Sequence, residues 1–319
     1  MRVLIIGAAG FVGRYLINYL RDEMRAFVTA TRLPREALEI PDIRILDLNI
    51  LQPQALCETL QAVRPDCIFH LAAQSSVALS WEKPALTADI NIKGTLNLLE
   101  AVRQLNYRPR LLLIGSGEEY GRLKPEEIPV SEDTVLRPGN IYAATKACQN
   151  MLGKIYADAY QLDILLIRAF NHIGPGQAPA FVVSDFCRQA ARIERGLQEP
   201  VLRVGNLSSR RDFTDVRDVV RAYALLAVHG KSGETYNVGS GHAVSIRQIL
   251  DCICSLSRAE IEVRTDEKRM RPADIPVIEA DISKLQQDTG WQPVIPLPST
   301  IEEVLQYWRD YLGNGGESV

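Results

Sequence analysis

The segment GAAGFVG at residues 7–13 constrains the fold of this chain more than any other feature of its sequence. It follows an apolar run at residues 3–6 and precedes an amphipathic stretch at residues 11–20, so it forms the turn between a first strand and a first helix. The three glycines permit a tight turn, a close approach of the backbone to a pyrophosphate, and close packing of the helix, whose N-terminal amides attract phosphate. The sequence therefore predicts a dinucleotide-binding turn. Its expected cofactor contacts are Gly7, Gly10, Phe11, Val12 and Gly13.

The first half of the chain alternates short apolar runs with amphipathic stretches. The apolar runs predict strands at residues 3–6, 26–30, 67–71, 111–115 and 164–168. The stretches between them predict helices at residues 11–20, 53–63, 87–104 and 141–160. Short apolar strands joined by helical crossovers are typical of parallel sheets that are covered on both faces. We therefore expect an α/β protein with a doubly wound parallel sheet, the Rossmann fold.

This alternation ends after Arg168, where the turn-forming segment FNHIGPGQAPAF begins. We expect a nucleotide-binding domain at residues 1–170, to which a segment near residues 212–238 returns. Residues 171–319 are expected to form a smaller α/β substrate-binding lobe that is discontinuous in sequence.

Composition excludes several classes of partner. The chain has 36 Lys+Arg against 39 Asp+Glu, a formal net charge of -3, which argues against a nucleic-acid binder or a polybasic membrane protein. No run approaches the roughly 18 apolar residues of a membrane span. The cysteines are scattered among apolar neighbours, which favours reduced thiols and a cytoplasmic location. Because cysteines and histidines do not cluster at ligand spacing, no metal site is expected.

The residues that follow the strand at 26–30, and those that end a further strand before residue 48, bear on the choice of cofactor. Arg32 stands where a carboxylate would favour NAD, and its guanidinium can pair with a 2′-phosphate, so we expect NADP. Alternatively, Arg32 is a solvated loop charge and NAD also fits. Asp47 and Leu48 are placed to contact the adenine, although Asp47 could instead cap a turn.

The spacing of Tyr142 and Lys146 in YAATK places both side chains on one face of a helix. An ammonium next to a phenol stabilises the phenolate, so the pKa of Tyr142 is expected to fall toward neutrality. The phenol could then exchange a proton with an alcohol or carbonyl while a hydride moves to or from a nicotinamide. Ser116, at the end of the strand at 111–115, would hold the same oxygen.

Over essentially its whole length, the sequence resembles the extended short-chain dehydrogenase/reductases that act on nucleotide sugars. The matching segments are GAAGFVG, DLN, FHLAAQSSV, NIKGTLNLLEA, GSGEEYG, YAATK, RAFNHIGPGQ and RRDFTDVRD. The resemblance implies a catalytic set of Ser116, Tyr142 and Lys146, the last two also touching the cofactor, and a homodimer formed through the helices at 87–104 and 141–160. It also implies cofactor contacts at the end of the strand at 67–71, just after it, and at the first residue of NIKGT. Those residues are Leu71, Ala72, Ala73 and Asn91.

Asn91 has two interpretations. It could lie at the nicotinamide pocket in a water-mediated proton path, or it could be an amide that packs a helix. Within the family, three segments are similar to those of the GDP-mannose 4,6-dehydratase branch. They are FNH, GNLSSRRDF and RPADIPVIEADISKLQQDTGWQP. By this resemblance Asn171 and Arg211 contact the sugar or diphosphate. Arg271 and Asp274 contact the diphosphate and guanosine, unless they form structural contacts.

The strip GSGEEYG departs from the dehydratase pattern. Dehydratases eliminate water with two adjacent side chains, which follow the Ser or Thr at the end of the strand. Gly117 stands where they have the first of these, Asp or Ser. Glu118 matches the second, their glutamate. Their longer arginine-rich loop after the second strand is replaced by the compact TRLPREALEI, which suits a cofactor that must exchange at each turnover.

We therefore expect reduction of the 4-keto group of GDP-4-dehydro-6-deoxy-D-mannose to a GDP-6-deoxyhexose such as GDP-D-rhamnose, with Ser116 and Glu118 touching the sugar. Three alternatives remain open. They are a GDP-mannose 4,6-dehydratase, a 4-epimerase or reductase that uses another nucleotide, and a dinucleotide-sensing protein without chemistry.

Overall fold

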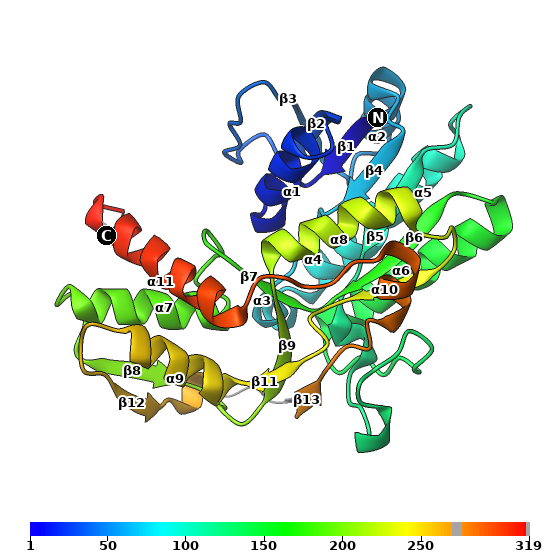
Figure 1. Cartoon of the computed structure of the whole chain (residues 1–319). Coiled ribbons are helices and arrows are strands. Elements are labelled where there is room, and N and C mark those ends of the chain that lie inside the picture. The colour runs from blue at the N-terminus through cyan, green and yellow to red at the C-terminus, as the bar shows by residue number, and fades with distance from the viewer. Residues whose placement is uncertain (270–275, 317–319) are drawn as a thin grey trace.

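A seven-stranded parallel sheet lies at the centre of the computed structural model, which describes residues 1–269 and 276–316 (Figure 1). The strand order is β10-β6-β5-β4-β1-β2-β3. This arrangement confirms the expected doubly wound fold. The strands are β1 (Arg2–Ile6), β2 (Phe27–Arg32), β3 (Arg44–Asp47), β4 (Cys67–His70), β5 (Arg110–Ile114), β6 (Ile164–Ala169) and β10 (Thr235–Val238).

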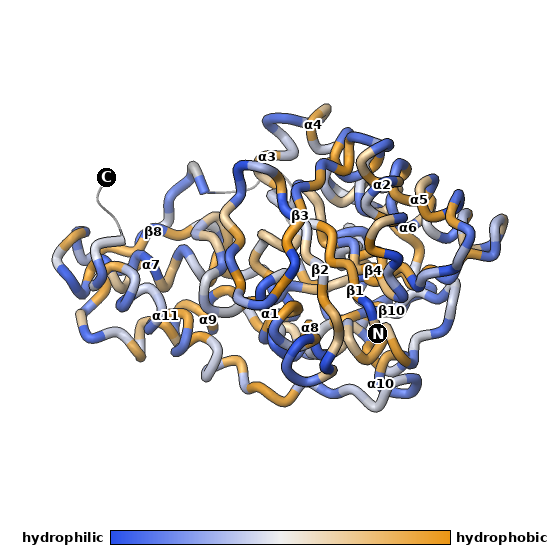
Figure 2. Tube along the Cα trace, turned by 90° about the horizontal axis from the view of Figure 1, so that it is seen from above, coloured by the Kyte–Doolittle hydropathy of each residue, from blue (hydrophilic) through white to orange (hydrophobic). Residues whose placement is uncertain are grey.

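Helices cover both faces of this sheet because its strands are apolar on both sides. In β1, Val3 and Ile5 face one core while Leu4 and Ile6 face the other, as the twofold periodicity of a strand requires. The first face carries α1 (Phe11–Asp22) and α8 (Val216–His229). The second carries α2 (Pro53–Val63), α5 (Gly94–Arg103) and α6 (Ile141–Tyr160). Seen from above, the hydrophobic segments run along β1 and β2 in the middle of the molecule (Figure 2).

The helix predicted at residues 87–104 is more complex in the structure. It begins earlier, at α4 (Pro84–Ala88), continues through a π-helical turn η1 (Asp89–Lys93), and only then becomes α5. Asn91 lies buried in this turn, and its side chain accepts from the N–H of Gln74 in a neighbouring loop. A preceding short helix, α3 (Val77–Glu82), was not predicted.

A second hydrophobic core lies beside the sheet, between the helices at the left of Figure 1. Phe186, Leu250 and Trp308 are among its buried side chains. Its helices are α7 (Val182–Glu194), α9 (Ile246–Leu256) and α11 (Leu297–Gly313), and a parallel strand pair, β8 (Val201–Val204) and β12 (Glu262–Thr265), lies next to them. α10 (Ser283–Thr289) packs against α8 and β10, on the side of the large sheet. Two short 3₁₀ helices are η3 (Pro125–Glu127), between β5 and α6 in the chain, and η4 (Glu267–Arg269), which follows β12.

A small sheet centred on β9 (Arg210–Asp215) connects the two halves. β9 pairs with β7 (Asn171–Ile173), β11 (Ala243–Ser245) and β13 (Val277–Ile278). It runs without a loop into α8, because Asp215 caps that helix by accepting from the backbone N–H of Arg217 at 2.7 Å. The carboxylate of Asp215 also accepts from the Thr300 hydroxyl at 2.7 Å. Across residues 1–269 and 276–316, no helix is long and apolar enough to cross a membrane.

Candidate active site

The glycine turn between β1 and α1 is shaped for a phosphate. Gly7 has φ +83°, and a Cβ there would lie 2.5 Å from the backbone of Ala72, so no other residue fits. A Cβ at Gly13 would lie 2.1 Å from the carbonyl oxygen of Ala8. Gly10, the N-cap of α1, is exposed, and its side-chain position is nearly open. Because no side chain caps α1, its first amides can donate to a pyrophosphate, and these residues fit a dinucleotide.

The neighbouring segments form the walls of this turn. Leu71, Ala72 and Ala73 follow β4 at the same edge of the sheet and are partly exposed. The Phe11 ring stacks on the His172 imidazole with a centroid distance of 6.2 Å and an interplanar angle of 5°. This contact places the glycine turn against β7. Sequence reasoning missed His172, although it stands next to the predicted Asn171.

Arg32 and Asp47, both predicted as cofactor contacts, are paired with each other. β2 and β3 align these residues, and Arg32 Nε donates to Asp47 Oδ1 at 3.2 Å. Arg32 Nη1 also donates to the carbonyl oxygen of Leu38 at 3.4 Å. The guanidinium is therefore held at the sheet edge. Leu48 is buried in the core and its N–H donates to the Arg32 carbonyl oxygen at 2.8 Å, so its side chain is placed for packing.

Ser116 and Tyr142 meet at the end of β5. Both are buried, and Ser116 makes a side-chain hydrogen bond with Tyr142. The expectation of a lowered phenol pKa is wrong for this structure. Burial raises the pKa of Tyr142, the hydrogen bond with Ser116 lowers it in part, and the carboxylates of Glu118 and Glu119 raise it further. The phenol is therefore protonated at neutral pH.

Lys146 lies one turn along α6 from Tyr142 and is also buried. Its ammonium donates to the carbonyl oxygen of Ile114 at 2.7 Å and to Gln149 Oε1 at 3.0 Å. Burial lowers the pKa of Lys146 to about 8, while the charge of Glu119 raises it. The lysine is thus mostly charged at neutral pH but directed toward the end of β5.

The strip after Ser116 forms a short 3₁₀ helix, η2 (Gly117–Tyr120). Glu118 is half-buried, and its Oε2 accepts from Asn140 Nδ2 at 3.2 Å. A Cβ at position 117 would lie 3.1 Å from Cγ and Cδ1 of Phe170. The ring of Phe170 therefore occupies the space into which a side chain at position 117 would extend.

A hollow opens beside this strip. Asn171 and Arg211 reach it from the paired strands β7 and β9, so the structure brings these predicted substrate contacts to Glu118. Asp212, which sequence reasoning missed, fixes the wall: its carboxylate accepts from the backbone N–H groups of Ser240 at 2.6 Å and Ala280 at 3.1 Å. Its only sequence signal is its place next to Arg211. The lining residues are Gly117, Glu118, Ala169, Phe170, Asn171, Arg211, Asp212 and Ile278.

Two other predicted substrate contacts, Arg271 and Asp274, lie outside the described residues.

Asn91 is buried, and its side chain is fully used in protein contacts. Its Oδ1 accepts from the N–H of Gln74 at 2.8 Å, and its Nδ2 donates to the Gln74 carbonyl oxygen and the Thr145 hydroxyl, each at 3.0 Å. This geometry favours the packing interpretation of Asn91. Within the described part of the chain, no group of three His, Cys, Asp or Glu side chains could hold a metal ion.

Comparison with known proteins shows which families this chain resembles. The chain is 34% identical to the GDP-6-deoxy-D-mannose reductase of Pseudomonas aeruginosa, over 97% of each protein. It is 30% identical to a UDP-glucose 4-epimerase of Mycolicibacterium smegmatis, over 97% of this chain and 99% of the relative. The solved structure of RMD from Pseudomonas aeruginosa complexed with NADPH matches with a TM-score of 0.85 at 34% identity, over 97% of this chain and 99% of that one.

The sequence also matches the model of the GDP-mannose 4,6 dehydratase family over residues 4–304, nearly its whole length. The resemblance seen in the motifs is thereby confirmed, and this chain belongs to the GDP-mannose 4,6 dehydratase family.

Proposed function

We propose that this protein uses NADPH to reduce the 4-keto group of GDP-4-dehydro-6-deoxy-D-mannose, giving a GDP-6-deoxyhexose such as GDP-D-rhamnose. A GDP-6-deoxy-D-mannose reductase among its relatives, and a solved structure of RMD that holds NADPH, support this assignment. The observation that carries the choice of reduction over elimination is that position 117, beside the ring of Phe170, is a glycine without a side chain.

Elimination of water from a sugar needs a base at one carbon and a proton donor at the leaving hydroxyl. The strip after β5 retains a carboxylate, Glu118, but Gly117 has no side chain that could donate a proton. A side chain at position 117 would also press on the ring of Phe170. The proton donor that elimination requires is therefore absent from position 117, and the ring of Phe170 lies close to that position.

Reduction needs only the groups that the site contains. The keto oxygen lies between the Ser116 hydroxyl and the Tyr142 phenol, which both hydrogen-bond to it. NADPH, when bound at the glycine turn, supplies the hydride to C4. Tyr142 gives its proton to the keto oxygen, and its raised pKa keeps that proton available at neutral pH. The charge of Lys146 then stabilises the phenolate that remains.

The rest of the substrate binds along the second half of the protein. Arg211 offers a guanidinium to the diphosphate, and Asn171 offers an amide to the sugar. A second hollow receives the nucleoside, where the carboxylate of Glu199 can accept from the N1–H and the amino group of guanine. That hollow is lined by Arg188, Gln189, Gln198, Glu199, Val201, Arg203 and Arg269.

The protein acts as a homodimer formed through α5 and α6. Met151 and Ile155 lie four residues apart on α6, so they share a face, and they are 61% and 55% exposed. Leu96 on α5 is also exposed. A second copy of the same face would bury these apolar side chains, as in an isologous interface.

The deciding experiment offers the purified protein two substrates. With the 4-keto sugar nucleotide and NADPH, we expect oxidation of NADPH, followed at 340 nm, and one deoxyhexose product identified by NMR. With GDP-mannose and NADP, we expect no 4-keto product.

Glu118→Gln serves as the internal comparison, because it keeps the hydrogen-bonding shape and removes the base. We expect it to retain reduction to within about tenfold. Dehydration of GDP-mannose that disappears in Glu118→Gln would show that the protein is a dehydratase.

A further inference from the structure

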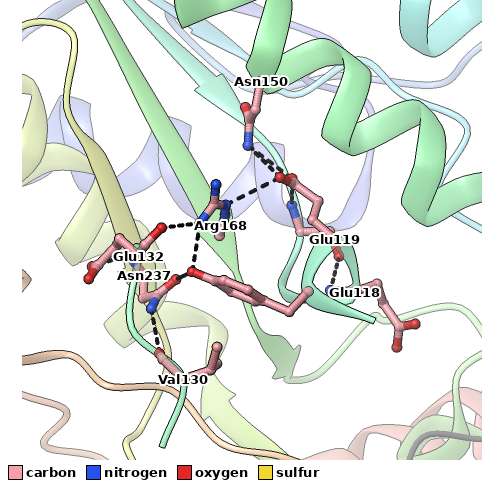
Figure 3. A network of polar contacts seen from close by, with 9 residues as sticks. Glu118, Glu119, Val130, Glu132, Asn150, Arg168 and Asn237 are labelled. Atoms are coloured by element: carbon pink, nitrogen blue, oxygen red, sulfur yellow. Dashed lines mark hydrogen bonds and ion pairs between the residues drawn. The ribbon is translucent and has the colours of Figure 1, made fainter. Parts of the chain in front are cut away.

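The second glutamate of the strip, Glu119, is completely buried, whereas Glu118 next to it faces the hollow. Its Oε1 accepts from the backbone N–H of Ser116 at 2.8 Å, and Asn150 Nδ2 donates to both of its carboxylate oxygens, at 2.9 and 3.0 Å. Arg168 Nε forms an ion pair with its Oε2 at 3.3 Å. Figure 3 shows Glu119 between Asn150 and Arg168, while the carboxylate of Glu118 points away from them.

These contacts belong to a larger buried polar cluster made of Glu119, Tyr120, Glu132, Asn150, Arg168 and Asn237. Arg168 Nη1 donates to the Tyr120 hydroxyl and to the Glu132 carbonyl oxygen, each at 2.8 Å. The Tyr120 hydroxyl donates to Asn237 Oδ1 at 2.6 Å. Burial raises the pKa of Glu119, while the charge of Arg168 and the hydrogen bonds from the Ser116 N–H and Asn150 lower it. Because an arginine keeps its charge in a protein, the buried guanidinium of Arg168 favours the ionised form of Glu119.

Glu119 acts on the catalytic set in two ways. Through the Ser116 N–H it closes a capping box in which Ser116 Oγ accepts from the N–H of Glu118, so it fixes the backbone that carries the catalytic hydroxyl. Its charge also acts on Lys146 and partly offsets the effect of burial on that lysine. The chain leaves room for this carboxylate by placing Gly115 here, since a Cβ at that position would lie 2.3 Å from Glu119 Oε1.

We propose that Glu119 is a positioning residue of the active site: its buried carboxylate holds Ser116 in place and supplies the negative charge that acts on Lys146. This role rests on the proposed reduction, but the effect of Glu119 on Lys146 can be tested without measuring reduction. The groups that face Lys146 are Glu119 from η2, His70 from β4, Gln149 from α6 and the Ile114 carbonyl from β5. Of these, Glu119 is the negatively charged one, and His70 is neutral because burial lowers its pKa to about 3.

The sign of the effect follows from these neighbours. Glu119→Gln removes the negative charge and leaves the Arg168 guanidinium unpaired nearby, so the charged form of Lys146 becomes less favourable. The pKa of Lys146, already lowered by burial to about 8, should fall further, by roughly one unit. Activity that requires a charged lysine should then decline at a lower pH.

The test measures the pKa of Lys146 directly, by NMR of protein labelled at its lysine side chains, and the pH profile of kcat for ketone reduction. We expect Glu119→Gln to lower the lysine pKa by about one unit, to shift the alkaline limb of kcat equally, and to reduce kcat at least about tenfold with KM within about twofold. The NMR titration needs no substrate, so it remains informative even if the protein does not reduce the proposed ketone.

Two variants separate positioning from simple support of the fold. Glu119→Asp keeps the charge but cannot reach the Ser116 N–H, so we expect a near-normal lysine pKa with reduced kcat. Glu132→Gln removes a carboxylate from the far side of the same cluster, where its Oε1 accepts from the Asn237 N–H at 2.8 Å, and we expect an unchanged pH profile. If Glu119→Gln fails to fold, Glu119→Asp carries the kcat test. An unchanged lysine pKa in Glu119→Gln, an unchanged kcat in either Glu119 variant, or an equal pKa shift in Glu132→Gln would overturn the proposal.

Discussion

Replacing Arg32 with alanine tests how this protein selects its cofactor. In the structure the Arg32 side chain is 29% exposed and its guanidinium is paired with Asp47, so a hydrogen-bonded ion pair with a 2′-phosphate should lie at the low end of the range for charged groups, about 1.5 kcal/mol. Arg32→Ala also leaves the Asp47 carboxylate unpaired beside that phosphate. In a water-like dielectric this repulsion adds about 1 kcal/mol.

Together these effects predict that kcat/KM for NADPH falls by roughly 60-fold, since each 1.4 kcal/mol is a factor of about ten. NADH lacks the 2′-phosphate, so its kcat/KM should change by less than about threefold. Both values are measured with the 4-keto sugar nucleotide, and cofactor dissociation constants from nucleotide fluorescence provide a measurement that needs no substrate.

Asp47→Asn is the matched control, because it removes the repelling charge and releases the guanidinium. It should preserve or strengthen the preference for NADPH. If the ratio of NADPH to NADH use is the same in Arg32→Ala as in the unmodified protein, Arg32 does not bind the 2′-phosphate and the pair with Asp47 only stabilises the sheet edge.

Four further outcomes follow from the site. Tyr142→Phe keeps the ring but removes the proton donor, so kcat should fall by about 100-fold or more while NADPH binding, measured by fluorescence, stays the same. Arg211→Ala should raise KM for the GDP-sugar by about tenfold or more with little effect on KM for NADPH, and a loss confined to kcat would contradict its binding role. Because reduction needs a charged Lys146, whose pKa is about 8, and a protonated Tyr142, whose pKa is raised, the rate should be steady near pH 7 and decline above pH 8. Ile155→Arg should convert a dimer to a monomer in light scattering, and a monomeric unmodified protein would contradict the proposed interface.

Much of the fold could be predicted because local pattern and global structure agree. The apolar runs marked all five strands named in advance to within two residues, and the helices at 53–63 and 141–160 have the predicted bounds. The glycines of the first turn have the expected steric reasons, since two of them contact other backbone segments closely. The π-turn at Asn91 could not be predicted, because it depends on bonds to Gln74 and Thr145, which lie far away in sequence.

The electrostatics of the site were harder to predict than its members. The spacing of Tyr142 and Lys146 correctly placed both on one helix. Their burial could not be predicted from this spacing, and burial raises the pKa of the Tyr142 phenol instead of lowering it as expected. Likewise, Glu118 and Glu119 are indistinguishable as adjacent acids. Only the 3₁₀ turn, which directs one toward the hollow and the other into the protein, separates them. The homodimer and the cytoplasmic location stay predictions.

The uninterrupted passage from β9 into α8 has a mechanical consequence. Arg211 stands at one end of this unit, and at the other end α8 packs on α1, the helix that begins at the glycine turn. At the junction, the carboxylate of Asp215 is hydrogen-bonded by Arg217 and Thr300. We therefore expect β9 and α8 to form a rigid unit, here called the strut, between the site for the cofactor and the site for the sugar nucleotide. Substrate capture should then proceed without hinge bending at this junction, and the amides of residues 210–217 should exchange equally slowly with and without ligands. Faster exchange in the free protein would show that the strut bends.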